Sequence, residues 1–324
     1  ETAISLAVTE PNAKVIDDAT SSTNPVSPKR SIIYLMALVL GGLIPFGVIY
    51  LINLLDNKIK SRLDIERNTT IPFIGHVPKA DNPNEIIQLY SRTNTAEAIR
   101  IIRTNLEFLL KDVQDGLAKT IFVTSTFSKE GKTFVSVNLA STIALSDKKV
   151  LLVVMDIRNT KIDDYLQVPA VGLTNYLSSN KYNSIDELIV KIDNYSNFYV
   201  LPAGIIPPNP AELLMDKKVE KLFVELRTKF DYIIVDTSPV SMVTDTLIIA
   251  HLADTFVYVT RANYSDKRML KFPQQLYVES KLPNMSILIN DTDSKKGYGY
   301  GYGYGYGYGV EVEKKSWWKR MLGR

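Results

Sequence analysis

An uncharged run of 25 residues, SIIYLMALVLGGLIPFGVIYLINLL at 31–55, constrains the fold more than any other part of this chain. As a helix rising about 1.5 Å per residue, it would extend about 37 Å, enough to cross the ~30 Å hydrocarbon core of a bilayer with some tilt. A buried helix of a soluble protein is seldom so long and apolar on every face. The run begins too late, and is too long, for a signal peptide. We therefore predict a transmembrane helix over 31–55.

Basic residues around this run lean to its C-terminal side. Lys29 and Arg30 precede it, and the residues that follow it are Lys58, Lys60, Arg62 and Arg67. Cytoplasmic flanks of membrane helices carry the excess of Lys and Arg, so we predict that the later part is cytoplasmic and that residues 1–30 are periplasmic. The nucleotide motif described below favours the same orientation because ATP is cytosolic. The first residue, Glu1, suggests a fragment of a longer protein.

The charge balance and the scarce residue types exclude several functions. The formal net charge is +3, from 38 basic and 35 acidic residues, which is too near balance to predict nucleic-acid binding. The chain has no cysteine, so disulfides, thiolate catalysis and cysteine-ligated metals are excluded. The two histidines, His76 and His251, are far apart in the sequence and argue against histidine metal sites or Ser-His-Asp chemistry.

From about residue 93, short apolar runs alternate with helical stretches. The runs are KTIFVTS, KVLLVVMD, NFYVLPAG, FDYIIVDTSP, TFVYVTRA and MSILIND. Runs of this length, rich in β-branched and aromatic residues and separated by helices, predict a mainly parallel sheet with helices on both faces. The pattern stops at Asp291.

The expected domain plan follows from these patterns. It comprises a juxtamembrane segment 1–30, the transmembrane helix 31–55, a cytoplasmic linker 56–92, an α/β P-loop domain 93–290, and a tail 291–324. The linker contains a short strand, IPFIGHVP, between prolines.

A phosphate-binding loop follows the run TIFVTS. Gly131, Lys132 and Thr133 open a helix directly after a strand and a loop, which is the context that a Walker A motif requires. We expect Lys132 to reach the β and γ oxygens of ATP and the Thr133 hydroxyl to meet Mg²⁺. Thr126 replaces the first glycine of the motif. The complete expected ATP-binding set is Thr126, Phe127, Ser128, Lys129, Glu130, Gly131, Lys132, Thr133 and Phe134.

Two aspartates end apolar runs and are expected at the same edge of the sheet. Asp236 ends FDYIIVD and suggests a Walker B carboxylate, although a strand-end aspartate that caps the next turn is the alternative. Asp156 ends KVLLVVMD, at the edge where open α/β sheets bind ligands. Thr133, Asp156 and Asp236 are therefore expected to converge on one metal. A buried Asp156 also needs a partner, and Arg158 is the basic neighbour that we expect if no metal is bound.

Six tyrosines alternate with glycines near the C-terminus: Tyr298, Tyr300, Tyr302, Tyr304, Tyr306 and Tyr308. Alternating glycines cannot pack a core and lose much backbone entropy on ordering, so we predict a disordered Gly-Tyr tail. Taken alone, the tract also fits a low-complexity adhesive segment.

Together these motifs resemble the bacterial tyrosine kinases, the cytoplasmic part of capsule and exopolysaccharide co-polymerases. The fragments that carry the resemblance, in chain order, are NPVSPKRS, TAEAIRIIRTNLEFL, the GKT loop, LPAGIIPPNPAELL and DTSPVSMVTDTLIIAHLAD. MinD and ParA ATPases look similar in fold, but they carry a signature lysine where this chain has Phe127.

The resemblance implies an ATP-dependent tyrosine autokinase of the inner membrane. Its tyrosine cluster would be the substrate, phosphorylated between subunits of a homo-oligomeric ring, an octamer in that family. Asp156 would orient or deprotonate the phenol. Glu97, Arg100 and Arg103, spaced E-x2-R-x2-R along one helical stripe, would contact the neighbouring subunit, whereas spacing alone equally fits a solvated face. A tyrosine phosphatase and polysaccharide export and polymerisation proteins are the further partners implied.

One position departs from the family pattern. The Walker A′ motif has the form hhhDxDxR, and in VVMDIR its first aspartate is replaced by Val154. Residues i and i+2 of a strand face the same way, so a carboxylate is missing beside Asp156. Three alternatives therefore stay open: an active kinase, a nucleotide-gated scaffold that controls polysaccharide chain length without catalysis, and a plain ATPase.

Overall fold

The computed structural model describes residues 27–179 and 181–293. Segment 1–26 and the whole tyrosine tract lie outside the described residues, so the predictions made for them are not compared with structure. The chain divides into two compact units, Glu1–Asn57 and Lys58–Arg324, and each is described by itself.

The first unit contains helix α2 (Arg30–Leu55), which matches the predicted span to one residue. Residues Arg30–Ile52 have a mean hydropathy of 2.4 and no buried positions, and within the described residues this is the one helix long and apolar enough to cross a membrane. Pro45 lies inside the helix. A helix with apolar side chains exposed all round is stable in lipid rather than in water, which supports the predicted membrane segment.

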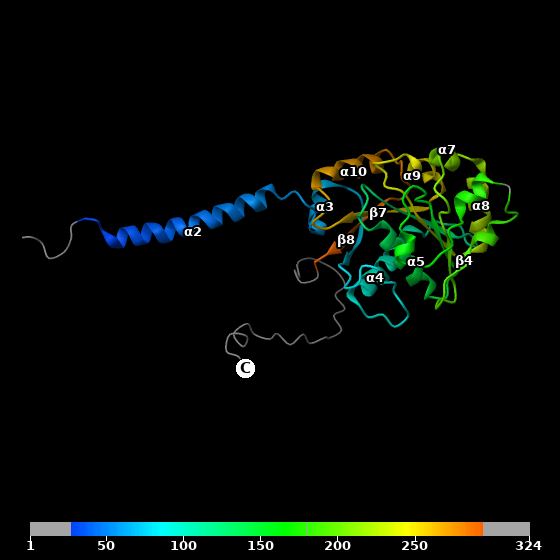
Figure 1. The fold of residues 1–324 in the computed structure, drawn as a ribbon, viewed down its shortest axis with the longest axis horizontal. Helices are drawn as coiled ribbons and strands as arrows, with labels where there is room; N and C mark the ends of the chain where they lie inside the picture. Colours follow the sequence, from blue (N-terminus) through cyan, green and yellow to red (C-terminus); the bar gives the residue numbers. More distant parts are fainter. Residues whose placement is uncertain (1–26, 180, 294–324) are drawn as a thin grey trace, which may run out of the picture. The chain divides into compact units, whose positions relative to one another are not determined.

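The second unit is built on an eight-stranded sheet with the order β1-β8-β7-β2-β6-β3-β5-β4 (Figure 1). The strands are β1 (Phe73–Pro78), β2 (Lys119–Ser125), β3 (Val150–Val154), β4 (Val190–Lys191), β5 (Phe198–Leu201), β6 (Tyr232–Asp236), β7 (Thr255–Arg261) and β8 (Ser286–Thr292). All neighbours pair in parallel except the two-residue β4, which is antiparallel to β5. The predicted mainly parallel sheet is confirmed.

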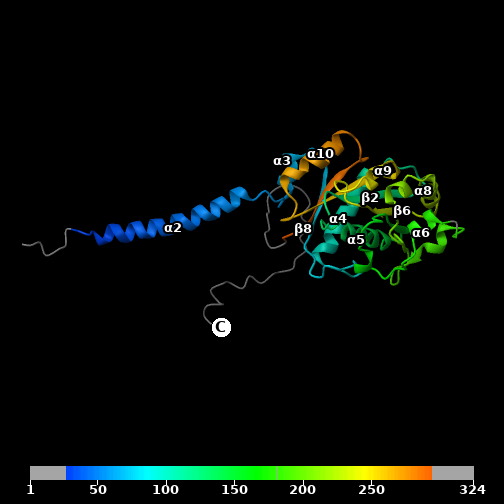
Figure 2. The same cartoon turned by 45° about the horizontal axis from the view of Figure 1, so that its top comes forward.

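Helices cover both faces of the sheet. The larger ones are α4 (Asn94–Leu109), α5 (Lys132–Ala144), α8 (Lys217–Lys229) and α10 (Lys271–Val278); the shorter ones are α3 (Arg62–Asn68), α6 (Leu173–Ser178), α7 (Pro210–Leu214) and α9 (Asp245–Ile248). Helices α4 and α5 lie on one face, and α3, α9 and α10 lie on the other (Figure 2). The central strands are therefore buried on both sides, which explains why their sequences are almost continuously apolar rather than alternating.

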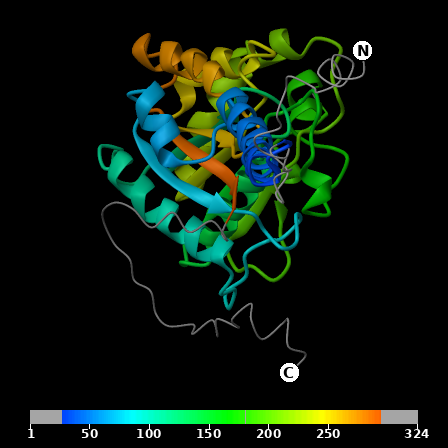
Figure 3. The ribbon, with the colours of Figure 1, turned by 90° about the vertical axis from the view of Figure 1, so that its left-hand side faces the viewer.

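The segment predicted as a linker, 56–92, contributes to this domain. Its strand β1 pairs with β8 at one edge of the sheet (Figure 3), and the side chains of Ile59, Ile65 and Ile87 are fully buried. The compact unit therefore begins at Lys58 rather than at residue 93. Helix α4 packs so closely on β1 that a Cβ atom at Gly75 would lie 2.8 Å from Ile102.

Candidate active site

The loop between β2 and α5 has the backbone of a phosphate cradle. Gly131 caps α5 with φ of +96°, and a Cβ atom there would lie 1.9 Å from the side-chain nitrogen of Asn290. The left-handed backbone favours glycine at this position, and a larger residue would also displace the Asn290 side chain. The helix that follows begins at Lys132 and is buried along all 13 residues. Its free N–H groups and its dipole favour a bound anion at this end.

Lys132 lies between the two predicted carboxylates. Its Nζ atom is 2.7 Å from Asp156 Oδ2 and 3.6 Å from Asp236 Oδ1, and 8%, 4% and 1% of the three residues' surfaces are exposed. Burial alone would lower the pKa of Lys132, but the charges of Asp236 and Asp156 outweigh it and raise that pKa above the usual lysine value. Burial raises the pKa of Asp236. Two carboxylates thus face one ammonium, so the electrostatics of the site would favour a further bound cation.

Thr133, Asp156 and Asp236 are brought together as predicted. Thr133 Oγ1 donates to Asp236 Oδ2 at 2.7 Å, and Ser238 Oγ donates to Asp156 Oδ1 at 3.0 Å. Within the described residues there is no group of three or more His, Cys, Asp or Glu side chains that could hold a metal. Two carboxylates and a hydroxyl nevertheless fit Mg²⁺, which proteins hold through one or two carboxylates with nucleotide phosphates and water completing its shell.

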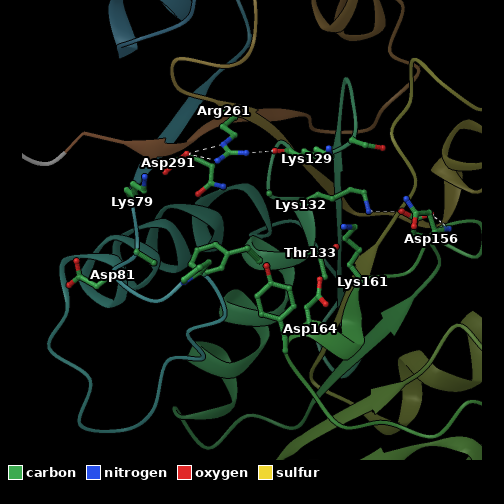
Figure 4. Close-up of a pocket in the computed structure, with 18 residues that line it drawn as sticks. Lys79, Asp81, Lys129, Lys132, Thr133, Asp156, Lys161, Asp164, Arg261 and Asp291 are labelled. Carbon is green, nitrogen blue, oxygen red and sulfur yellow. Dashed lines mark hydrogen bonds and ion pairs between the residues drawn. The ribbon is translucent and has the colours of Figure 1, made fainter.

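A cavity of about 500 Å³ opens beside this cluster, within the ~300–1,000 Å³ range of small-molecule sites (Figure 4). Of the nine predicted ATP-binding residues, six line it: Ser128, Lys129, Gly131, Lys132, Thr133 and Phe134. Thr126, Phe127 and Glu130 do not. Thr126 is instead buried, with its hydroxyl 2.9 Å from the Tyr258 hydroxyl.

Sequence reasoning missed a second group of cavity residues: Lys79, Asp81, Lys161, Asp164, Tyr165, Arg261, Asn290 and Asp291. Arg261 bridges the loop and the sheet edge, since it donates to the Lys129 carbonyl at 3.0 Å and to Asp291 at 2.8 Å (Figure 4). Arg261 ends β7, and Asn290 and Asp291 lie in the last three residues of β8, so position at the carboxyl edge of parallel strands was the signal that could have identified them. Burial, with the charges of Asp164 and Asp236, raises the pKa of Tyr165 to about 12, which keeps it protonated.

Arg158 does not have its expected partner. Its guanidinium pairs with Asp245, with Nε and Nη2 at 2.6 and 2.9 Å from the two carboxylate oxygens, while Lys132 is the cation beside Asp156. The fork of the guanidinium matches a carboxylate better than the point charge of a lysine does, and Asp245 is only 1% exposed.

Val154, which replaces the first aspartate of the Walker A′ pattern, is fully buried and lies opposite Asp236 on the neighbouring strand.

The predicted interface residues lie on α4 with partners in their own chain. Arg100 forms an ion pair with Glu97 and donates to the Ser91 carbonyl at 2.8 Å, and Arg103 donates to the Thr142 carbonyl at 3.2 Å. Most of the Glu97 side chain is exposed. Contact with another subunit remains a prediction.

The fold and the loop define a P-loop nucleotide-binding protein of the α/β class, and sequence comparison specifies its family. The AAA domain model matches residues 118–275, and the GNVR model, a G-rich domain, matches residues 1–53. Tyrosine-protein kinase CpsD of Streptococcus agalactiae is 32% identical over 205 residues, which cover 63% of this chain and 85% of that protein. The chain therefore belongs to the bacterial tyrosine kinases, or BY-kinases.

Longer relatives and solved structures agree with this assignment. Tyrosine-protein kinase ptk of Acinetobacter johnsonii is 28% identical over 89% of this chain, but the match spans only 40% of ptk. The kinase domain of the Escherichia coli tyrosine kinase ETK superposes with a TM-score of 0.64 at 25% identity, over 76% of this chain and all of that one. The BceF tyrosine kinase domain gives a TM-score of 0.62 at 25% identity, over 72% and 99% of the two chains. The GNVR match and helix α2 fit a protein of the bacterial inner membrane.

Proposed function

We propose that this chain is the membrane-anchored kinase part of a tyrosine autokinase that regulates capsular or exopolysaccharide polymerisation and export. The observation that carries the proposal is the buried contact of Lys132 with Asp156 and Asp236 beside a nucleotide-sized cavity. The chain's membership of the tyrosine kinase family supports the same proposal. The acceptors would be the six tail tyrosines, Tyr298 to Tyr308, of a neighbouring copy. The N-terminal segment would be periplasmic, and the domain and tail cytoplasmic.

Each residue of the site has a role in the proposed transfer. The phenol oxygen of the acceptor attacks the γ-phosphorus of ATP, an O–P bond to tyrosine forms, and the bond to the β-phosphate oxygen breaks with release of ADP. Asp156 accepts the phenol proton, and Lys132 neutralises charge on the transferring group. Thr133, Asp156 and Asp236 would hold Mg²⁺, which supplies further positive charge at the phosphates when it is bound. Catalysis then rests mainly on positioning and electrostatics.

The proposed assembly is a homo-oligomeric ring, an octamer by family resemblance, with Glu97, Arg100 and Arg103 at the subunit contact. Six phosphotyrosines would add roughly −9 to −12 charges to each tail, and neighbouring tails would then repel one another. We expect the ring to form unmodified and to come apart once phosphorylated. A tyrosine phosphatase and export and polymerisation proteins would complete the cycle.

The test is incubation of the full chain with Mg²⁺ and ATP, followed by a phosphotyrosine blot. The signal should disappear in Lys132→Met and after truncation at Asp293. Mixing full-length Lys132→Met with the active, tail-truncated chain should restore phosphorylation of the inactive copy. Failure of that mixture to label would contradict transfer between copies.

A second function, a non-catalytic nucleotide-gated scaffold that controls polysaccharide chain length, is favoured by one observation. Val154 replaces the first family aspartate and is buried beside Asp236. Assembly that depends on ATP without phosphotyrosine would support this alternative. Release of inorganic phosphate with bare tyrosines would indicate a plain ATPase.

A further inference from the structure

Glu130 belongs to the phosphate loop, but its side chain turns away from the cavity. The residue is 1% exposed. Its Oε2 atom accepts a hydrogen bond from the Phe127 N–H at 2.7 Å, and its Oε1 atom accepts one from the Ser265 hydroxyl. The Glu130 carbonyl accepts a further bond from the Asn290 side chain at 3.1 Å. The carboxylate therefore links Phe127 of its own loop to Ser265, in the segment that begins at the end of β7.

That segment, residues 261–266, forms further hydrogen bonds with the loop. Arg261 donates to the Lys129 carbonyl at 3.0 Å, and Tyr264 donates its hydroxyl proton to the Ser128 carbonyl at 3.4 Å. The Ser265 hydroxyl also accepts from the Arg261 N–H at 2.9 Å, which fixes its orientation toward Glu130. The loop backbone from 127 to 130 is thus held by hydrogen bonds from this segment.

The same segment is paired with the chain that follows the apolar helix. The Ile59 N–H donates to the Ser265 carbonyl at 2.9 Å, and the Asn263 N–H donates to the Ile59 carbonyl at 2.8 Å. Ile59 is fully buried, and the Lys58 ammonium donates to the Tyr264 carbonyl at 2.8 Å. Helix α2 ends at Leu55, so only two residues, Asp56 and Asn57, separate it from Lys58.

Burying a carboxylate at position 130 costs folding free energy. Burial raises the pKa of Glu130, because its hydrogen bonds only partly replace lost hydration. An uncharged side chain of similar shape would cost less if stability alone mattered. The carboxylate instead accepts two bonds at once, which fixes a loop that a bound phosphate requires to be already in place.

We propose that Glu130 and Ser265 are positioning residues that hold the phosphate loop ready for nucleotide, and that the backbone pairing of Ile59 makes this support depend on the segment after the apolar helix. The inference rests on the proposed nucleotide site but not on phosphoryl transfer. It assigns the 261–266 segment a role in ATP affinity although, within that segment, only Arg261 lines the cavity.

The test is a double-mutant cycle on Mg²⁺–ADP affinity, measured by calorimetry on the full chain in detergent micelles. We expect Glu130→Ala to weaken binding about tenfold or more and Ser265→Ala about fivefold, with the double variant no weaker than Glu130→Ala within about twofold. Glu130→Gln can accept from Phe127 and donate to Ser265, so it should stay within about threefold of the parent. Hydrogen exchange should speed up at both Phe127 and Ile59 in Ser265→Ala.

The matched control is Ser286→Ala, which removes another buried hydroxyl, one that donates to the Phe256 carbonyl at 3.1 Å at the amino end of β8. It should lower the melting temperature without changing ADP affinity by more than about twofold. Multiplicative losses in the cycle, unchanged affinity in Ser265→Ala, or exchange that changes at Phe127 but not at Ile59 would overturn the proposal. If Glu130→Ala does not fold, the test rests on the ADP affinities of Glu130→Gln and Ser265→Ala and on hydrogen exchange in Ser265→Ala. A parent chain that binds no Mg²⁺–ADP would instead contradict the proposed function.

Discussion

The ammonium of Lys132 lies 2.7 Å from a carboxylate oxygen of Asp156, in a pocket where both side chains are almost wholly buried. A buried ion pair is costly to break from one side only, because the remaining charge is then left without a partner. Lys132 therefore contributes to the stability of the site as well as to its chemistry.

Replacing Lys132 with Met should abolish tyrosine phosphorylation and also lower the free energy of unfolding by about 3–5 kcal/mol. Urea unfolding and a phosphotyrosine blot measure the two effects. The double variant Lys132→Met, Asp156→Asn should recover part of the stability but none of the activity. Phosphotyrosine in either variant would exclude the proposed role of the lysine.

Restoring the family carboxylate with Val154→Asp should make the site more dependent on metal. The new side chain would lie opposite Asp236, and like charges in this position repel. We expect a loss of about 1–3 kcal/mol without Mg²⁺, and a larger rise in melting temperature on adding Mg²⁺ than in the parent. Val154→Asn is the uncharged control. An equal response to Mg²⁺ in all three chains would show that position 154 does not face the metal.

The Arg158–Asp245 pair should stabilise the domain more than an exposed pair does. Asp245 is buried, but 39% of the Arg158 side chain is exposed, so we discount the cost of Arg158→Ala to about 1–3 kcal/mol in urea unfolding. The control is Arg268→Ala, where 74% of the arginine side chain is exposed beside Asp266 and little or no loss is expected. Similar losses in the two variants would mean that burial of Asp245 contributes little.

Glu130 should make stability depend on pH. Burial raises its pKa in the folded state, so folding favours the protonated form, and stability falls as pH rises from the ordinary glutamate value of about 4.3 through the raised one. Glu130→Gln removes this loss, so its advantage over the parent should be small at pH 4 and should grow as pH rises through the raised pKa of Glu130. Unfolding free energies of both chains across this range give the difference. An advantage that shrinks with rising pH would contradict the raised pKa.

Glu97→Lys tests the helical stripe on α4. The change replaces an ion pair with Arg100 by repulsion, at a cost to folding of only about 0.5 kcal/mol, but it should weaken assembly strongly if the stripe lies between subunits. Sedimentation with Mg²⁺ and a non-hydrolysable ATP analogue measures the oligomer. Glu66→Lys, in a similarly exposed pair with Arg62 on α3, is the control and should assemble normally. Identical sedimentation of both variants would place the interface elsewhere.

The sequence predicted those features that depend on neighbours along the chain. The apolar helix, the GKT loop and the aspartates that end apolar strands all have local signals. Parallel strands bring their carboxyl ends to one edge, so even the meeting of Thr133, Asp156 and Asp236 could be predicted.

Other features were decided only by the tertiary structure. Strand β1 beside β8, Arg158 on Asp245 rather than Asp156, and Ser265 on Glu130 each join residues far apart in the chain. The short polar or apolar sequence patterns around these residues fit several partners equally well. Burial in the folded domain determines which partner each residue contacts. Once the sheet packs, a buried carboxylate or a strand edge must be satisfied by whichever group the fold has placed beside it.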